Sequence, residues 1–233
     1  MITRRRSEER GHADYGWLDT YHTFSFADYH DPDWVQFGSL RVLNQDRVAP
    51  GRGFGTHGHR DMEIVSVVLQ GVLEHRDSMG NGSQLRPGEV QLMSAGSGVT
   101  HSEFNASATE SLHFLQMWIL PRERGTAPRY EQKMFADEER SGRFRRVVSP
   151  DGRDGSLTIG QDAELYLGTL EPDHAARHEL PPGRVAWLHV ATGRAQIGGL
   201  ELAAGDGASI RDEGSIEVRA GARAEIVLWV LPD

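Results

Sequence analysis

The chain has 233 residues, of which 38% are hydrophobic and 25% charged, and its 27 glycines and 10 prolines are scattered without a period. This composition excludes a disordered chain and is sufficient for one large β domain or two small ones. The net charge of −9 argues against sequence-independent binding to nucleic acid. Cysteine is absent, so the chain forms no disulfides, and any metal must be held by histidines and carboxylates.

The N-terminal segment MITRRRSEERGHADYGW lacks the apolar core of a secretory signal, and no stretch is long enough to cross a bilayer. We therefore expect a cytoplasmic protein that does not contact a membrane.

Short apolar segments bounded by turn residues follow one another along most of the chain. Segments of this length, rich in Val, Ile and Leu, are typical of β-strands, and their repetition favours a sandwich or a barrel. In chain order they are SLRVLN (39–44), EIVSVVLQG (63–71), VLEHRD (72–77), EVQLMSAG (89–96), LHFLQMWIL (112–120), ELYLGTL (164–170), RVAWLHVATG (184–193) and AEIVLWVL (224–231). The chain is therefore predicted to be all-β.

The segment 121–145 interrupts this pattern, because it is charged and punctuated by prolines. We predict a linker region here, with a possible short helix around Glu131–Arg140. It would join an N-terminal domain, residues 1–120, to a C-terminal domain, residues 146–233.

The two halves resemble each other in three landmarks that occur in the same order. Segment 67–75 is similar to 189–197, 85–99 to 202–216, and 115–121 to 226–232. This order indicates a duplicated fold with shorter hairpins in the second copy, and it places Trp118 and Trp229 at matching positions, which favours a packing role for both.

Two pairs of potential metal ligands lie in the first half. His57 and His59 are two residues apart in GTHGHR, and His101 and Glu103 are two apart in GVTHSEFN. Residues i and i+2 of a strand point to the same face, so two neighbouring strands would present three imidazoles and one carboxylate together. That donor set suits Fe, Ni, Cu, Mn, Co or Zn, and leaves coordination positions open. Glu63 has the same parity as His57 and is an alternative carboxylate ligand.

The second half lacks such pairs. The positions equivalent to His101 and Glu103 are Val218 and Ala220, and the nearby His174 and His178 are four residues apart. We therefore expect no metal site in the C-terminal domain. His22, His75 and His113 are interpreted as packed or solvent-facing histidines of the β framework.

The glycine-led H-x-H motif of His57 and His59, followed by Gly88 and later by His101 and Asn105, is similar to the cupin motifs. It departs from them at Ser94, where proline is common, and in two additional residues before His101. The segments WLDTYHTFSFADYHDP (17–32) and GSGVTHSEFN (96–105) resemble the pirin family of bicupins, and within it bacterial pirin-like proteins with quercetin 2,3-dioxygenase activity.

This resemblance implies two tandem cupin barrels (double-stranded β-helix, jelly-roll), the C-terminal one degenerate. It implies that His57, His59, His101 and Glu103 bind one divalent transition metal ion, and it favours Glu103 over Glu63. Iron is the first expectation for the ion, with Ni, Co, Mn, Cu and Zn as alternatives.

The resemblance further implies a metal-dependent dioxygenase that cleaves flavonol-type aromatic substrates with release of carbon monoxide, with Glu103 as the catalytic base. Its partners would be a small aromatic substrate and dioxygen, with no direct contact to nucleic acid. One alternative is a metal-binding regulatory module that binds a protein partner, and another is a hydrolase or isomerase on the same scaffold. We expect a monomer, because the duplication already supplies two packed β units.

Overall fold

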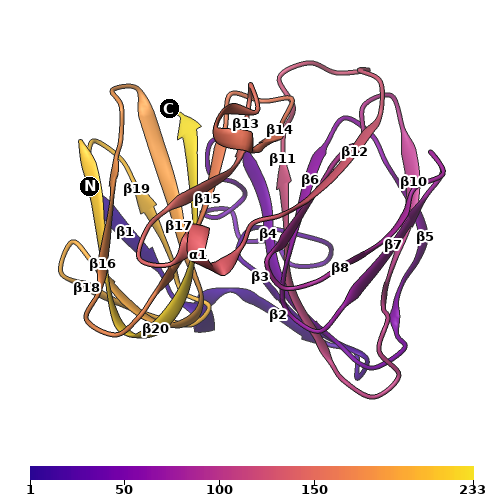
Figure 1. The fold of residues 1–233 in the computed structure, drawn as a ribbon, viewed down its shortest axis with the longest axis horizontal. Coiled ribbons are helices and arrows are strands. Elements are labelled where there is room, and N and C mark those ends of the chain that lie inside the picture. The colour runs from indigo at the N-terminus through magenta and orange to yellow at the C-terminus, as the bar shows by residue number, and fades with distance from the viewer.

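The computed structural model describes residues 1–233, and it consists of two β barrels that lie side by side (Figure 1). The first barrel combines a seven-stranded sheet, in the order β12-β9-β6-β11-β4-β3-β2, with a four-stranded sheet, β5-β10-β7-β8. Its strands are β2 (Gly11–Asp14), β3 (Leu18–His22), β4 (Leu40–Val48), β5 (Gly53–His59), β6 (Glu63–Gln70), β7 (Leu73–Asp77), β8 (Gly82–Leu85), β9 (Glu89–Ser94), β10 (Val99–Asn105), β11 (Leu112–Ile119) and β12 (Arg129–Met134).

The second barrel is formed by one nine-stranded sheet with the main path β1-β19-β17-β20-β15-β13-β14, to which β16 and β18 add through β20 and β17. Its strands are β1 (Ile2–Arg5), β13 (Arg145–Ser149), β14 (Leu157–Thr158), β15 (Glu164–Leu170), β16 (Ala175–Glu179), β17 (Arg184–Ile197), β18 (Leu200–Ala203), β19 (Gly207–Ile210) and β20 (Ser215–Pro232). The predicted all-β fold of two tandem barrels is confirmed. No helix of the structure has the length and apolar character that a membrane span requires.

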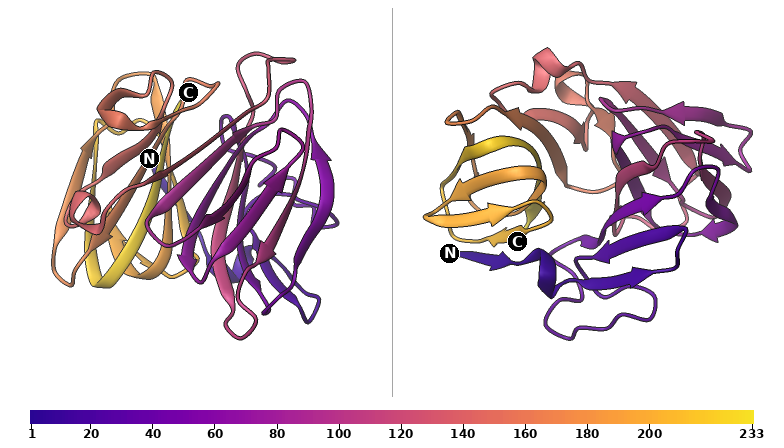
Figure 2. Two further views of the ribbon diagram at one scale, coloured as in Figure 1. Left: turned by 45° about the vertical axis from the view of Figure 1, so that its right-hand side comes forward. Right: turned by 90° about the horizontal axis from the view of Figure 1, so that it is seen from below.

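Strand pairing crosses the predicted domain limits at both ends of the first half. Residues 2–5 form β1, which pairs with β19 of the second barrel, so the N-terminus crosses to the other domain (Figure 2). Within the predicted linker, β12 pairs with β9 as the edge strand of the first barrel. The predicted helix is limited to α1 (Asp137–Arg140), because the residues before it are used in that strand pairing.

The apolar runs of the central strands are explained by burial on both faces. In β6, Val65 and Val67 belong to a core between the barrels, whereas Ile64 and Val68 face the interior of the first barrel. In β20, Val227 and Trp229 likewise face the first barrel. A strand buried on both faces needs no polar alternation, which is why these segments read as continuous hydrophobic stretches.

Aromatic residues of the N-terminal segment complete the core between the barrels. Phe24, Trp34 and Phe37 surround Trp187 of β17, with ring centroids 4.9, 5.7 and 5.5 Å away. The indole N–H of Trp229 donates a hydrogen bond to the sulfur of Met117, 3.1 Å away across the interface. The two barrels therefore share one hydrophobic core.

The interiors of the two barrels differ in polarity. The interior of the second barrel is filled by aliphatic and other apolar side chains of β15, β17, β19 and β20. The first barrel instead buries many polar side chains, among them Thr20, Asn44, Asp46, Ser66, His75, Gln91, His101 and Glu103. Buried polar groups are costly unless they are partnered, so the polar interior indicates a binding function for the first barrel.

Candidate metal centre

The antiparallel pairing of β5 and β10 brings the two predicted ligand pairs together. His57 lies directly opposite His101 in the register of this pair, and His59 lies opposite Val99. A bulge between His101 and Glu103 then shifts the register, so that Glu103 lies opposite Phe54. At Gly53 a Cβ atom would lie 2.2 Å from the carbonyl oxygen of Glu103, so this close approach of the two strands requires glycine.

Three imidazole nitrogens converge at the end of the first barrel. The Nε2 atom of His101 lies 3.0 Å from Nε2 of His59 and 3.1 Å from Nε2 of His57. Two neighbouring ligands at right angles around an ion, each about 2.1 Å from it, are separated by about 3.0 Å. The observed separations therefore fit three nitrogens directed at one ion.

Hydrogen bonding and burial prepare these histidines to act as neutral ligands. Nδ1 of His57 donates to the carbonyl oxygen of Gly55, 2.8 Å away, which leaves the Nε2 lone pair free. Burial lowers the pKa of His59 to about 4 and that of His101 to about 3, and the neighbouring imidazoles act in the same direction. Both rings are therefore neutral at pH 7, as metal coordination requires.

Glu103 is a buried carboxylate with one unsatisfied oxygen. Its Oε2 accepts a hydrogen bond of 2.7 Å from Nε2 of Gln116, whereas Oε1 is buried and has no hydrogen-bond partner. Burial raises the pKa of Glu103 to about 7. Ser66 and Gln91 lie close enough to act on this pKa in the opposite direction, so the carboxylate next to His101 has polar neighbours and is able to bind an ion or a proton.

The structure groups the donors into two overlapping sets, each with its ligand atoms within 4.8 Å of one another. One contains His57, His59 and His101, and the other contains His75, His101 and Glu103. Glu63 belongs to neither set. It starts β6, accepts a hydrogen bond of 2.7 Å from Ser94 Oγ, and lies against Gly160 of the second domain. Glu63 is thus placed away from the three imidazoles.

Behind His101 lies a buried chain of polar groups that sequence reasoning missed. Nδ1 of His101 lies 3.5 Å from Nδ1 of His75, whose Nε2 is 3.2 Å from Oδ2 of Asp77. His75 is 0% exposed, and its ring stacks on Tyr130 at 4.8 Å. Since the Asp77 carboxylate can only accept, it selects the Nε2–H form of His75, whose Nδ1 then accepts from His101. This order leaves Nε2 of His101 free for an ion.

A cavity of about 490 Å³ opens beside the three imidazoles. His57, His59 and Glu103 lie on its wall together with the aromatic side chains of Trp17, Phe26, Phe54 and Trp118. The indole of Trp118 packs edge-on against His59, with ring centroids 4.9 Å apart. Trp118, for which a packing role was predicted, therefore also lines this cavity. His22, interpreted as packed, is buried and lines the same cavity.

The register matching of the two halves shows why the second barrel differs. There, β16 and β20 form the pair that corresponds to β5 and β10, and Val218 lies opposite Ala176. Val218 and Ala220, at the positions equivalent to His101 and Glu103, are both buried among apolar side chains. The residues suited to a metal ion are concentrated in the first barrel.

The fold and this site together define a bicupin, a two-barrel protein with residues suited to a transition metal in its first barrel. Comparison with protein families agrees, because residues 3–119 match the Pirin model and residues 146–230 match the model of the quercetinase C-terminal cupin domain. The chain belongs to the pirin family.

Individual relatives are similar over the full length. A protein named quercetin 2,3-dioxygenase from Escherichia coli is 49% identical over 232 residues, which cover 100% of this chain and 99% of that protein. A pirin-like protein from Caulobacter vibrioides is 41% identical, with 98% of each chain covered. The crystal structure of the bacterial pirin YhhW from Escherichia coli in complex with nickel(II) superposes with a TM-score of 0.94 at 49% identity, covering 100% of this chain and 99% of that one.

Proposed function

We propose that this protein is a metal-dependent dioxygenase that cleaves flavonol-type aromatic substrates with dioxygen and releases carbon monoxide. The observation that carries the proposal is the grouping of His57, His59 and His101, with the Glu103 carboxylate next to His101, beside one aromatic-walled cavity. The names of full-length relatives support the same activity.

We assign His57, His59, His101 and Glu103 as the ligands of one divalent ion. Iron is the ion expected from the sequence, and the nickel(II) complex of YhhW makes nickel an equally strong candidate for this chain. When bound, the ion would supply positive charge that stabilises the deprotonated 3-hydroxyl group of a flavonol and an open position for a small molecule.

Glu103 would accept the proton of the substrate 3-hydroxyl at Oε1. Oε1 has two lone pairs, so it would serve the ion with one and take the proton with the other, while Gln116 holds Oε2 in place. Burial raises the pKa of Glu103 to about 7 without an ion, and the charge of a bound ion would lower it, so the group would be a carboxylate able to accept a proton at neutral pH.

The aromatic wall would bind the flat ring system. Trp17 and Phe54 meet edge-to-face at 5.4 Å on one side of the cavity, and Trp118 and Phe26 meet in the same way at 5.4 Å. Apolar walls with a few polar groups are typical of small-molecule sites, and they would exclude water from the reacting carbon atoms. Cytoplasmic location and a monomeric state stay predictions.

Oxygen consumption and carbon monoxide release test the proposal. Protein loaded separately with Ni(II), Fe(II), Co(II), Mn(II) or Cu(II) is mixed with quercetin, and with luteolin, which lacks the 3-hydroxyl, as the matched control substrate. We expect turnover of quercetin but not of luteolin, and loss of turnover in His101→Ala. Failure of every metal form to consume oxygen with flavonols would contradict the proposed function. Metal-dependent binding of a stoichiometric protein partner would then favour the regulatory alternative.

A further inference from the structure

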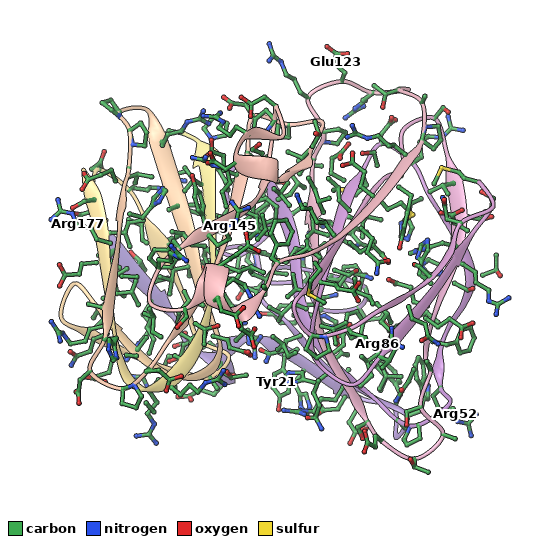
Figure 3. All side chains as sticks on the ribbon, viewed as in Figure 1. Tyr21, Arg52, Arg86, Glu123, Arg145 and Arg177 are labelled. Carbon is green, nitrogen blue, oxygen red and sulfur yellow. The ribbon has the colours of Figure 1, made fainter.

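A second cavity, of about 360 Å³, lies between the two barrels. It is lined by side chains of β3, β4 and β11 from the first barrel, by Ala191–Gly193 of β17 and the turn at Ala204 from the second, and by Ser7 and Arg10. Figure 3 labels Tyr21 of this cavity, which lies at the lower junction of the two barrels. Domain interfaces are a common place for ligand sites.

The alternation of strand residues separates this cavity from the candidate metal centre. On β3, Asp19 and Tyr21 face the cavity between the barrels, whereas Thr20 faces the cavity of the metal centre. On β4, Gln45 and Arg47 face the former and Asp46 faces the latter. The two cavities therefore lie on opposite faces of one sheet and share no lining residue.

Arg10 is the unusual group in this cavity. Its side chain is buried, with 7% of the residue exposed, yet it forms no ion pair, and its Nη1 has no hydrogen-bond partner. The other two buried arginines are paired, Arg5 with Asp31 and Arg140 with Asp137. A buried guanidinium without a direct ion pair is costly, so an anion beside Arg10 would be stabilised.

The charges of Asp206 and Asp46 raise the pKa of Arg10, but neither carboxylate forms an ion pair with its guanidinium. Asp206 accepts backbone N–H bonds from Ser7, at 2.6 Å, and from Ala203, at 3.0 Å. Asp19, which lines the cavity, binds Nε2 of His12 at 2.7 Å. Burial lowers the pKa of Arg10 only to about 10, so the guanidinium is charged at neutral pH.

Further donors converge on the same space. Nη2 of Arg10 donates to Ser7 Oγ at 3.0 Å, which holds the guanidinium beside a hydroxyl whose own proton has no protein acceptor. Arg47 lines the cavity without an ion pair, and Tyr21 lies under the Arg10 guanidinium at 4.9 Å. Guanidinium groups match the oxygen pairs of carboxylates and phosphates.

We propose that the cavity between the barrels is a binding site for one small oxyanion, a carboxylate or a phosphate, held by Arg10 and Arg47 with the hydroxyl groups of Ser7 and Tyr21. The bound anion would supply the direct ion pair that Arg10 lacks and would contact both barrels, so binding would also stabilise the folded chain.

Calorimetric titration of the metal-loaded protein with inorganic phosphate, and separately with acetate, tests the proposal at constant ionic strength. We expect saturable binding of one anion per chain by at least one of the two probes, accompanied by a rise in Tm. The probe that binds more tightly identifies the phosphate or the carboxylate as the preferred class.

Four variants locate the bound anion. Arg10→Gln and Ala204→Phe, which fills the cavity from an exposed turn position, are each expected to weaken binding by about tenfold or more. Arg177→Gln, which removes an exposed arginine on the far side of the second barrel (Figure 3), is expected to leave anion affinity unchanged, and so is His101→Ala, which is titrated without metal because it lacks a proposed ligand.

If neither probe shows saturable binding up to about 10 mM, any affinity is weaker than millimolar, and the proposal is overturned. It is also overturned if His101→Ala abolishes binding, which would place the anion at the metal. If Arg10→Gln does not fold, the anion affinity of Ala204→Phe is the deciding measurement. An affinity equal to that of the unmodified protein would contradict the site.

Discussion

His57 and His101 face each other across the β5–β10 pair, and their Nε2 atoms lie 3.1 Å apart. This relationship follows from strand register, because the paired residues of two neighbouring strands present their side chains on one face. His59 joins them because it follows His57 by two residues. The candidate metal centre is therefore a direct product of the sheet, and its geometry depends on the local pairing.

The carboxylate ligand is tested by comparing Glu103→Gln with Glu63→Gln. Glu103 lies in the donor set of His101, whereas Glu63 is held by Ser94 away from it. Loss of a hydrogen-bond partner behind a metal ligand lowers metal affinity by roughly 10–100-fold. We expect Glu103→Gln, which removes a ligand itself, to lower Ni(II) affinity by more than this, and Glu63→Gln to change it little. Competition with a chelator of known affinity measures both. The reverse order would move the carboxylate role to Glu63.

His75 is expected to orient His101 without touching the ion. His75→Phe keeps an aromatic ring against Tyr130 but removes the acceptor that faces Nδ1 of His101. We predict a loss of metal affinity of about 10–100-fold, together with a changed visible spectrum of the Co(II)-loaded protein. His178→Phe in the second barrel is the matched control. A Co(II) spectrum and affinity equal to the unmodified protein would show that His75 is only a packing residue.

Phe54 tests the aromatic wall of the cavity. Phe54→Ala removes a ring that packs on Trp17, and it leaves all four proposed ligands in place. Loss of part of the contact between the substrate rings and the Phe54 ring is expected to raise KM for quercetin by about tenfold, while the amount of bound metal stays constant. Phe104→Ala, which removes an exposed ring from β10, serves as the control. Equal KM values for the two variants would place the substrate elsewhere.

The shared core predicts that the barrels unfold together. Trp187→Ala removes a fully buried ring that contacts Phe24, Trp34 and Phe37 of the N-terminal segment. We expect a loss of about 3–5 kcal/mol in the free energy of unfolding, with a single urea transition. Val35→Ala, near the surface, is expected to change it by less than about 0.5 kcal/mol. Two separate transitions, with the first barrel unaffected by Trp187→Ala, would contradict a common core.

Sequence patterns predicted the features that depend on local periodicity. The spacing of His57 and His59, and of His101 and Glu103, is enough to place each pair on one face of a strand, and the apolar segments indicate the strands themselves. The matching order of landmarks in the two halves likewise predicted two barrels. Such features are visible because each depends on the order of residues along the chain and not on which strands pair in space.

Features that depend on strand partners were not predictable from the residues. β10 pairs with β5 along one edge and with β7 along the other, and only this second pairing brings His75 to His101. Nothing in the segment VLEHRD specifies it. The crossing of β1 to the second barrel and the use of β12 as an edge strand also depend on which edges are free after folding. The unpaired state of Arg10 similarly required the positions of Asp19 and Asp206 in space.

The most direct test of the metal centre is Ni(II) titration followed by X-ray absorption spectroscopy, on the unmodified protein and on His57→Ala and His101→Ala. We predict one ion per chain, a first coordination sphere with three imidazole nitrogens, and loss of tight binding in both variants. Stoichiometric binding that survives in both variants, or a spectrum without imidazole scattering, would contradict the site.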